Sequence, residues 1–157
     1  MSTPTTFTLQ HNLPDVHEFV YETLLDFKKF GEVHPFMTEV TVIKENLPEY
    51  VEYNIVEEVY FLGFIKNRPT YTARVMEIEK NRHIRYTSPV KNFIFLTIDI
   101  TFSKNKNGSL LVTEKFEIQS NKLMGILFGN LLKKAHLKFF ANMKKLLHTS
   151  VEDVQLN

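Results

Sequence analysis

The chain has 157 residues, of which 43% are hydrophobic and 24% are charged, a composition typical of one globular domain and not of a disordered chain. Its formal net charge of +1 argues against a dedicated nucleic-acid binder, and the absence of cysteine excludes disulfides and thiolate zinc sites. Residues 1–10 lack the pattern of a signal peptide, and no apolar stretch approaches about 18 residues. We therefore expect a cytoplasmic protein without a transmembrane segment.

Hydrophobic spacing predicts the first elements in chain order. Residues 7–13 alternate as a short strand, and residues 16–30 have apolar side chains at helical spacing. Asp15 stands where a helix cap is expected, and Gly31 is placed to end the helix. Residues 31–36 then form a connector with room for one more helical turn.

Six further strands are predicted after residue 38, because the hydrophobic period changes to two. They cover residues 39–46, 50–62, 69–79, 83–89, 92–103 and 109–120. Turn sequences join them, including KNKNG at 104–108, which is typical of a hairpin. Consecutive turn-linked strands favour an antiparallel meander.

A long helix over residues 122–148 ends the predicted domain, and a polar tail, 150–157, is expected to fray. At about 100° per residue, one arc of this helix carries Lys133, Lys134, Lys138, Lys144 and Lys145. The opposite arc carries Phe128, Leu132, Ala135, Phe139, Met143 and Leu146. A G-x-x-x-G pattern at 125–129 predicts close approach of the helix to the sheet.

The element order is strand, helix with a short second helical turn, six strands and a long helix, which predicts an α+β fold. This order, with VHPF at 33–36 and the segments at 68–88 and 123–147, resembles the START-like superfamily, also called SRPBCC. That superfamily includes START lipid-transfer domains, the birch pollen allergen family, and polyketide cyclases and dehydrases. The resemblance covers about residues 5–149 and implies a single domain over 1–157 with a helix-grip fold. In that fold a curved antiparallel sheet wraps the C-terminal helix, with a cavity between them.

Two carboxylates occupy positions where the strand pattern places apolar side chains. Glu57 alternates in register with Tyr53 and Ile55, and Glu114 alternates with Val112 and Phe116. Because burying an ionised carboxylate is costly, each requires a partner, water or a proton. Either each sits at a wet rim or pairs with an inward Arg or His, or both line a cavity and contact a ligand.

The pattern predicts a set of ligand-binding side chains on the inward face. They are His34, Tyr53, Glu57, Tyr71, Tyr86, Glu114, Phe116, Phe128, Leu132 and His136. The ligand expected there is a hydrophobic or amphipathic small molecule such as a lipid, a fatty acid or a polycyclic compound. The alternative is an enzyme similar to polyketide cyclases and dehydrases, with His34, Glu57, Glu114 and Tyr86 as candidate acid–base groups. No nucleotide-binding, hydrolase or metalloprotease motif is present, so no cofactor and no metal site is predicted.

Two surface features leave the choice of partners open. The lysine arc is either a solvated helix face or a site for weak contact with anionic lipid or an acidic partner. The run YFLGFI at 60–65 lies at a predicted hairpin tip, and it either packs on the core or is exposed at a cavity entrance or a dimer contact. Both a monomer and a homodimer fit the sequence.

Overall fold

The computed structural model describes residues 3–90 and 93–155. Its helices are α1 (His17–Leu25), α2 (Phe27–Val33) and α3 (Lys122–Gln155). Its strands are β1 (Thr5–Leu13), β2 (Met37–Asn46), β3 (Tyr50–Glu57), β4 (Val59–Phe61), β5 (Ile65–Asn67), β6 (Thr70–Glu79), β7 (His83–Val90), β8 (Ile94–Lys104) and β9 (Leu110–Gln119).

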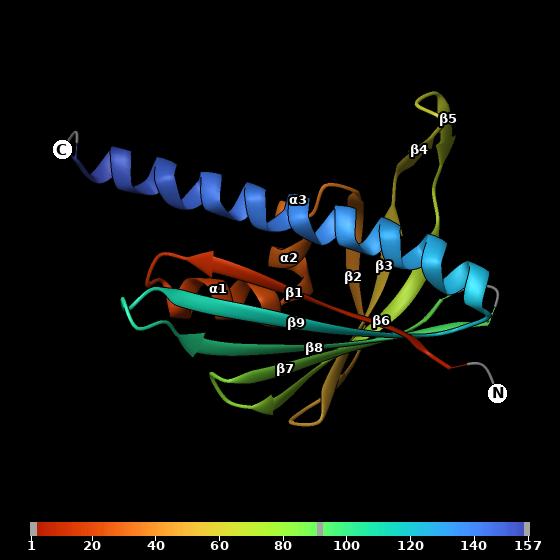
Figure 1. The fold of residues 1–157 in the computed structure, drawn as a ribbon, viewed down its shortest axis with the longest axis horizontal. Helices are drawn as coiled ribbons and strands as arrows, with labels where there is room; N and C mark the ends of the chain where they lie inside the picture. Colours follow the sequence, from red (N-terminus) through yellow and green to blue (C-terminus); the bar gives the residue numbers. More distant parts are fainter. Residues whose placement is uncertain (1–2, 91–92, 156–157) are drawn as a thin grey trace.

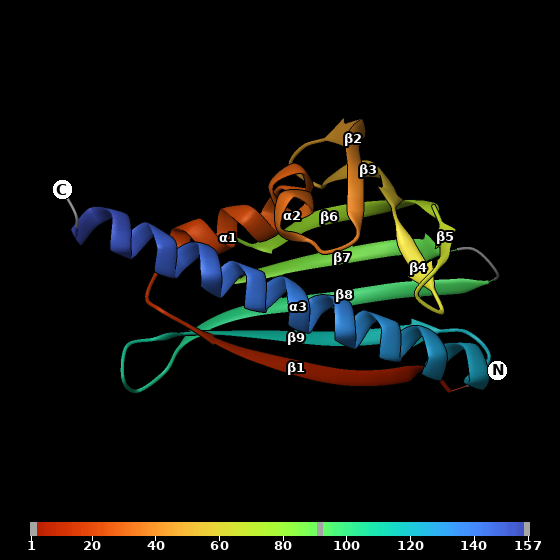
Figure 2. The same cartoon turned by 90° about the horizontal axis from the view of Figure 1, so that it is seen from above.

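Seven of these strands form one antiparallel sheet in the order β1-β9-β8-β7-β6-β3-β2. The sheet is curved, and α3 lies along one of its faces (Figures 1 and 2). β1 pairs with β9, which places the first strand of the chain beside the last one at an edge of the sheet. The predicted α+β helix-grip fold is confirmed.

Strict alternation of buried and exposed residues explains how the sheet builds the core. Along β8 every second side chain is buried, from Ile94 to Phe102, and β9 repeats the pattern from Leu110 to Ile118. α3 covers this face with Phe139, which is fully buried and stacks on Phe30 of α2. Truncating a buried phenylalanine of this kind typically costs about 3–5 kcal/mol, so the contact between α3 and α2 contributes strongly to stability.

The helix predicted over residues 16–30 is two helices. The chain becomes extended at Asp26, whose carboxylate accepts a hydrogen bond from the backbone N–H of Lys28 and caps α2. Two details of the prediction are wrong. Gly31 lies inside α2, where an added Cβ would stand 2.7 Å from a methyl group of Val40, so the glycine permits close packing of α2 on β2. Asp15 does not cap α1, because the N-cap is Val16 and the Asp15 carboxylate pairs with Lys104.

The two faces of α3 are largely those predicted. The five lysines are exposed, while Ala135, Phe139 and Met143 are buried. Leu146 was predicted on the buried face and is 47% exposed, because Leu147 is the residue buried at this turn. The helix also continues to Gln155, beyond its predicted end at residue 148.

The G-x-x-x-G glycines bring α3 close to the sheet, as predicted. A Cβ added to Gly125 would stand 2.4 Å from the Thr5 hydroxyl oxygen, and one added to Gly129 would stand 3.4 Å from the ring of Phe7. Both neighbours belong to β1. A side chain at Gly125 would therefore force the first turn of α3 away from this strand.

Candidate functional site

A cavity of about 280 Å³ lies between the sheet, α2 and the N-terminal half of α3. Most of its wall is apolar, from the aromatic rings of α2 to Phe128 and Leu132 of α3. The polar groups in the wall include His34, Glu57 and His136. An apolar volume with a few polar groups is the usual form of a small-molecule site.

Glu57 is the last residue of β3, and its side chain lies in the cavity wall. The hydroxyl group of Tyr71 on β6 donates a hydrogen bond of 2.6 Å to its Oε1. Burial raises the pKa of Glu57 above its usual value, although the Tyr71 hydrogen bond and the charge of His136 oppose the rise. The environment therefore favours the neutral carboxylic acid more than water does.

His34 follows α2 and also lines the cavity. Its Nδ1 accepts a hydrogen bond of 3.2 Å from the backbone N–H of Phe36, so the proton of the neutral ring is on Nε2. Burial, together with the charge of His136, lowers the pKa of His34 to about 3. At neutral pH this ring is therefore an uncharged hydrogen-bond donor.

Glu114 has a different environment, because both of its carboxylate oxygens contact histidines. His11 Nε2 is 2.9 Å from Oε2, and His136 Nδ1 is 2.7 Å from Oε1. The Glu114 side chain has no exposed surface. Burial alone would raise the pKa of Glu114, but attraction to His136 and the hydrogen bonds from both rings lower it to about 2. The carboxylate is therefore ionised, and it holds both imidazoles in place.

The structure places seven of the ten predicted binding residues in the cavity wall. They are His34, Glu57, Tyr71, Tyr86, Phe128, Leu132 and His136. The other three, Tyr53, Glu114 and Phe116, are buried in the core and do not line the cavity. Their side chains are buried, as the strand register predicted, but in the core and not at the cavity.

Tyr86 lines the cavity, but its hydroxyl group donates a hydrogen bond to the backbone carbonyl of Leu24. This bond takes up the proton that an acid–base role would use. The sequence prediction missed the polar cavity-wall residues Asn67, Thr87 and Ser88, and it missed His11 in the core. His11 alternates with Leu9 and Leu13 on the inward face of β1, the same signal that marked Glu57.

The predicted strand over residues 50–62 ends at Glu57, and β4 belongs to a separate hairpin with β5. Glu57 still lies in the cavity wall although the strand ends there. A turn at Leu62 and Gly63, both with positive φ, closes the hairpin. The hairpin projects from the sheet beside α3 (Figures 1 and 2).

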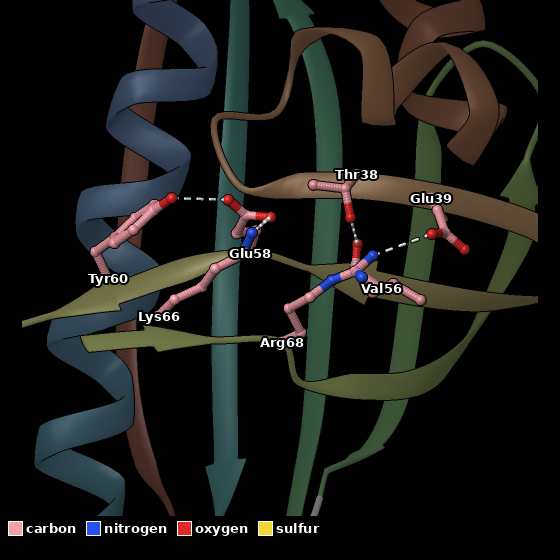
Figure 3. Close-up of polar contacts among 7 residues, drawn as sticks. All are labelled: Thr38, Glu39, Val56, Glu58, Tyr60, Lys66 and Arg68. Atoms are coloured by element: carbon pink, nitrogen blue, oxygen red, sulfur yellow. Dashed lines mark hydrogen bonds and ion pairs between the residues drawn. The ribbon is translucent and has the colours of Figure 1, made fainter. Parts of the chain in front are cut away.

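Polar contacts join residues at the base of this hairpin to each other and to β2 (Figure 3). Val59 and Asn67, also at the base, line the cavity. Glu58 accepts a hydrogen bond from Tyr60 and pairs with Lys66 at 3.0 Å. Arg68 reaches Glu39 of β2 at 3.1 Å. The tip is exposed, one of the two alternatives left open by the sequence, and its Leu62 and Phe64 side chains are 70% and 76% exposed.

Within residues 3–90 and 93–155, no group of three or more His, Cys, Asp or Glu side chains is arranged to hold a metal ion. In the same part of the chain, no helix combines the length and the apolar character needed to cross a membrane.

No family profile matches the sequence, and no curated protein matches it either. Solved structures do match. Ara h 8.0201 aligns with a TM-score of 0.69 at 11% identity, over 94% of this chain and 99% of its own. A START superfamily protein from Mycobacterium smegmatis gives 0.69 at 11% identity, over 90% and 98% of the two chains. A protein of unknown function from Staphylococcus aureus gives 0.70 at 12%, over 96% and 97%.

The chain has the helix-grip fold of the START-like superfamily. The sequence resemblance to that superfamily is thereby confirmed for the fold. At these identities the likeness extends to the architecture and not to a shared ligand or reaction.

Proposed function

We propose that this protein binds an amphipathic small molecule in the cavity beneath α3, with the apolar body against the aromatic wall and the polar end at Glu57. The observation that carries the proposal is the composition of the cavity, which has mostly apolar walls and a few hydrogen-bonding side chains. Filling 280 Å³ with apolar atoms provides affinity, and the polar groups provide orientation.

The polar end of the ligand is expected to be neutral. His34 is uncharged at neutral pH because its pKa is lowered, so it offers a hydrogen bond and no positive charge. A ligand carboxylate beside Glu57 would place two acidic groups at one site, which requires one of them to take up a proton. An alcohol or a ketone avoids this cost, so we favour such ligands over fatty acids.

The fluorescent amine N-phenyl-1-naphthylamine tests whether the cavity binds apolar compounds. We expect saturable binding that is abolished by Ala135→Trp, because Ala135 lines the cavity and the indole would fill it. Lys133→Trp on the exposed arc of α3 is the matched control and should bind normally. Equal binding by both variants, or no binding by the wild type, would overturn the proposal.

Displacement of this probe by 2-naphthol and by 2-naphthoate tests the preference for a neutral ligand. At pH 7 we expect 2-naphthol to bind at least about 10-fold more tightly, equivalent to about 1.4 kcal/mol. Glu57→Gln should narrow the difference by improving the binding of 2-naphthoate. Glu52→Gln, on the same strand, is the control, because Glu52 pairs with Arg74 and does not line the cavity.

A second candidate is an enzyme similar to polyketide cyclases and dehydrases. One observation favours it: the cavity-lining His136 is held by a buried carboxylate. A carboxylate that fixes the orientation and tautomer of a histidine is a common arrangement in acid–base catalysis.

A further inference from the structure

A buried hydrogen-bonded network joins side chains from three elements, His11, Glu114 and His136. His11 is on β1, Glu114 on β9 and His136 on α3, and His11 and His136 are each 4% exposed. The His11 ring stacks on Phe140, with ring centroids 3.6 Å apart, which fixes its position. His11 and Glu114 do not line the cavity, whereas His136 does. The network therefore extends from the core to the cavity wall, where it ends at the imidazole ring of His136.

The contact with Glu114 determines which nitrogen of His136 is available. The ionised carboxylate accepts a hydrogen bond from Nδ1–H at 2.7 Å, so in the neutral ring Nε2 holds the lone pair. Among the described residues, every fully buried side-chain nitrogen and oxygen has a hydrogen-bond partner. Nε2 of His136 has no such partner there, so it is reached by solvent, and the cavity is the space that its side chain lines. In its neutral form His136 thus presents a base to a bound molecule.

His34 presents the complementary group. Its Nδ1 is occupied by the backbone N–H of Phe36, which leaves Nε2–H as a donor. The rings of His34 and His136 have centroids 6.4 Å apart and are nearly perpendicular, at 82°. A donor and a base this close can contact two atoms of one ligand that are separated by a single carbon, namely a carbonyl oxygen and the carbon next to the carbonyl carbon.

We propose that His136 transfers protons at the carbon next to a ligand carbonyl, with His34 bound to the carbonyl oxygen and Glu114 positioning His136. Nε2 of His136 takes the proton as the C–H bond breaks. That electron pair forms the new C=C bond, and the carbonyl π pair moves to the oxygen, which accepts the hydrogen bond from His34. Return of the proton to carbon restores both groups, and no oxidant or reductant is needed. This inference rests on the proposed function and adds a substrate class, enolisable ketones.

Hydrogen exchange on the bicyclic ketone 2-tetralone in D₂O, followed by NMR, tests this step. We expect exchange at least about 100-fold faster than in buffer, the range of general acid–base catalysis. His136→Gln should return the rate to that of buffer, and His34→Gln should lower it. His148→Gln is the matched control, because His148 is an exposed histidine of the same helix. Displacement of N-phenyl-1-naphthylamine by 2-tetralone is measured in parallel for each variant.

Kinetics and NMR test separately whether Glu114 positions His136. Glu114→Gln should lower the exchange rate about 10–100-fold and move its pH profile, since an amide holds no charge beside His136. In the wild type, long-range ¹H–¹⁵N spectra should show His136 with the proton on Nδ1, and this measurement needs no variant to fold. A proton on Nε2 instead would overturn the inference.

The two proposals fail differently. If 2-tetralone displaces the probe but exchanges at the buffer rate, the proton-transfer inference is wrong and ligand binding stands. The proton-transfer inference is also wrong, and ligand binding still stands, if the folded His136→Gln variant exchanges 2-tetralone as fast as the wild type. If the wild type binds neither the probe nor the ketone, both proposals are overturned.

Discussion

Glu57 and Glu114 have the same sequence signature, a carboxylate in the apolar register of a strand, and the fold gives them opposite environments. Glu57 lies in a cavity wall with one hydrogen-bond donor, Tyr71. Glu114 lies in the core with an imidazole on each oxygen. Burial raises the pKa of Glu57, whereas the two histidines more than offset burial at Glu114 and lower its pKa.

The difference shows that strand register determines where a side chain points and that its partners determine which charge it holds. At the cavity, burial moves both Glu57 and His34 toward their neutral forms, although their pKa values shift in opposite directions. In the core, Glu114 is held as an anion. Polar groups whose neutral forms are favoured, as at the cavity, are suited to binding a ligand that comes and goes. An ionised group with two buried partners, as at Glu114, is suited to a structural contact.

The largest expected effect comes from removing each carboxylate. Glu114→Leu should lower the free energy of unfolding by about 3 kcal/mol, because His11 and His136 would both be buried without a partner. Glu57→Leu should change it by less than about 1 kcal/mol, since it removes a partly desolvated charge and leaves only the Tyr71 hydroxyl group unpaired. Urea unfolding of both variants measures the difference. Equal losses would mean that Glu57 is also a structural ion-pair partner.

The fold and most of the cavity wall could be predicted because both follow from periodicity. Alternation placed Glu57, Tyr71 and Tyr86 inward, and helical spacing placed Phe128 and Leu132 on the covered face of α3. The same reasoning could have found His11, which stands in the apolar register of β1.

Periodicity could not predict how deeply an inward side chain lies or where a strand ends. Alternation does not distinguish a core position from a cavity wall, so Tyr53 and Phe116 were assigned to the cavity although they are core residues. The break after Glu57 depends on tertiary contacts, since Glu58 donates its backbone N–H to the carbonyl of Phe36 while the hairpin residues pair with each other. Phe36 is far from Glu58 in the sequence, so the strand pattern gives no sign of this contact.

The pH dependence of stability should separate the two carboxylates by sign. The folded pKa of Glu114 is lowered, so its contribution is fully present above its unfolded pKa and is lost as the pH falls toward about 2. The pKa of Glu57 is raised, so its ionised form costs stability that appears as the pH rises above the unfolded value. Relative to the wild type, Glu114→Gln should be destabilised at pH 7 and progressively less so below pH 4.5, whereas Glu57→Gln should gain stability toward pH 7.

Urea unfolding between pH 3 and pH 8 measures these differences. A single titrating group changes the slope of the unfolding free energy against pH by at most about 1.4 kcal/mol per pH unit. His34 contributes to the same curves, because its lowered pKa makes the fold lose stability as the pH falls from 6.5 toward about 3. Each variant is therefore compared in a His34→Gln background as the control. If both glutamine variants shifted the curve in the same direction, the contrast between the two sites would be wrong.

The smallest expected effect concerns the hydrogen bond from Tyr71 to Glu57. A double-mutant cycle with Tyr71→Phe and Glu57→Gln should give a coupling free energy of about 1 kcal/mol, the usual contribution of one hydrogen bond. Because this bond opposes the effect of burial, Tyr71→Phe alone should raise the pKa of Glu57 further, which ¹³C NMR of its carboxyl group would detect. The rise would favour the neutral acid and should improve 2-naphthoate binding in the same direction as Glu57→Gln, but to a smaller extent. A lower pKa for Glu57 in Tyr71→Phe would show that Tyr71 excludes water from the carboxylate more than it stabilises its charge.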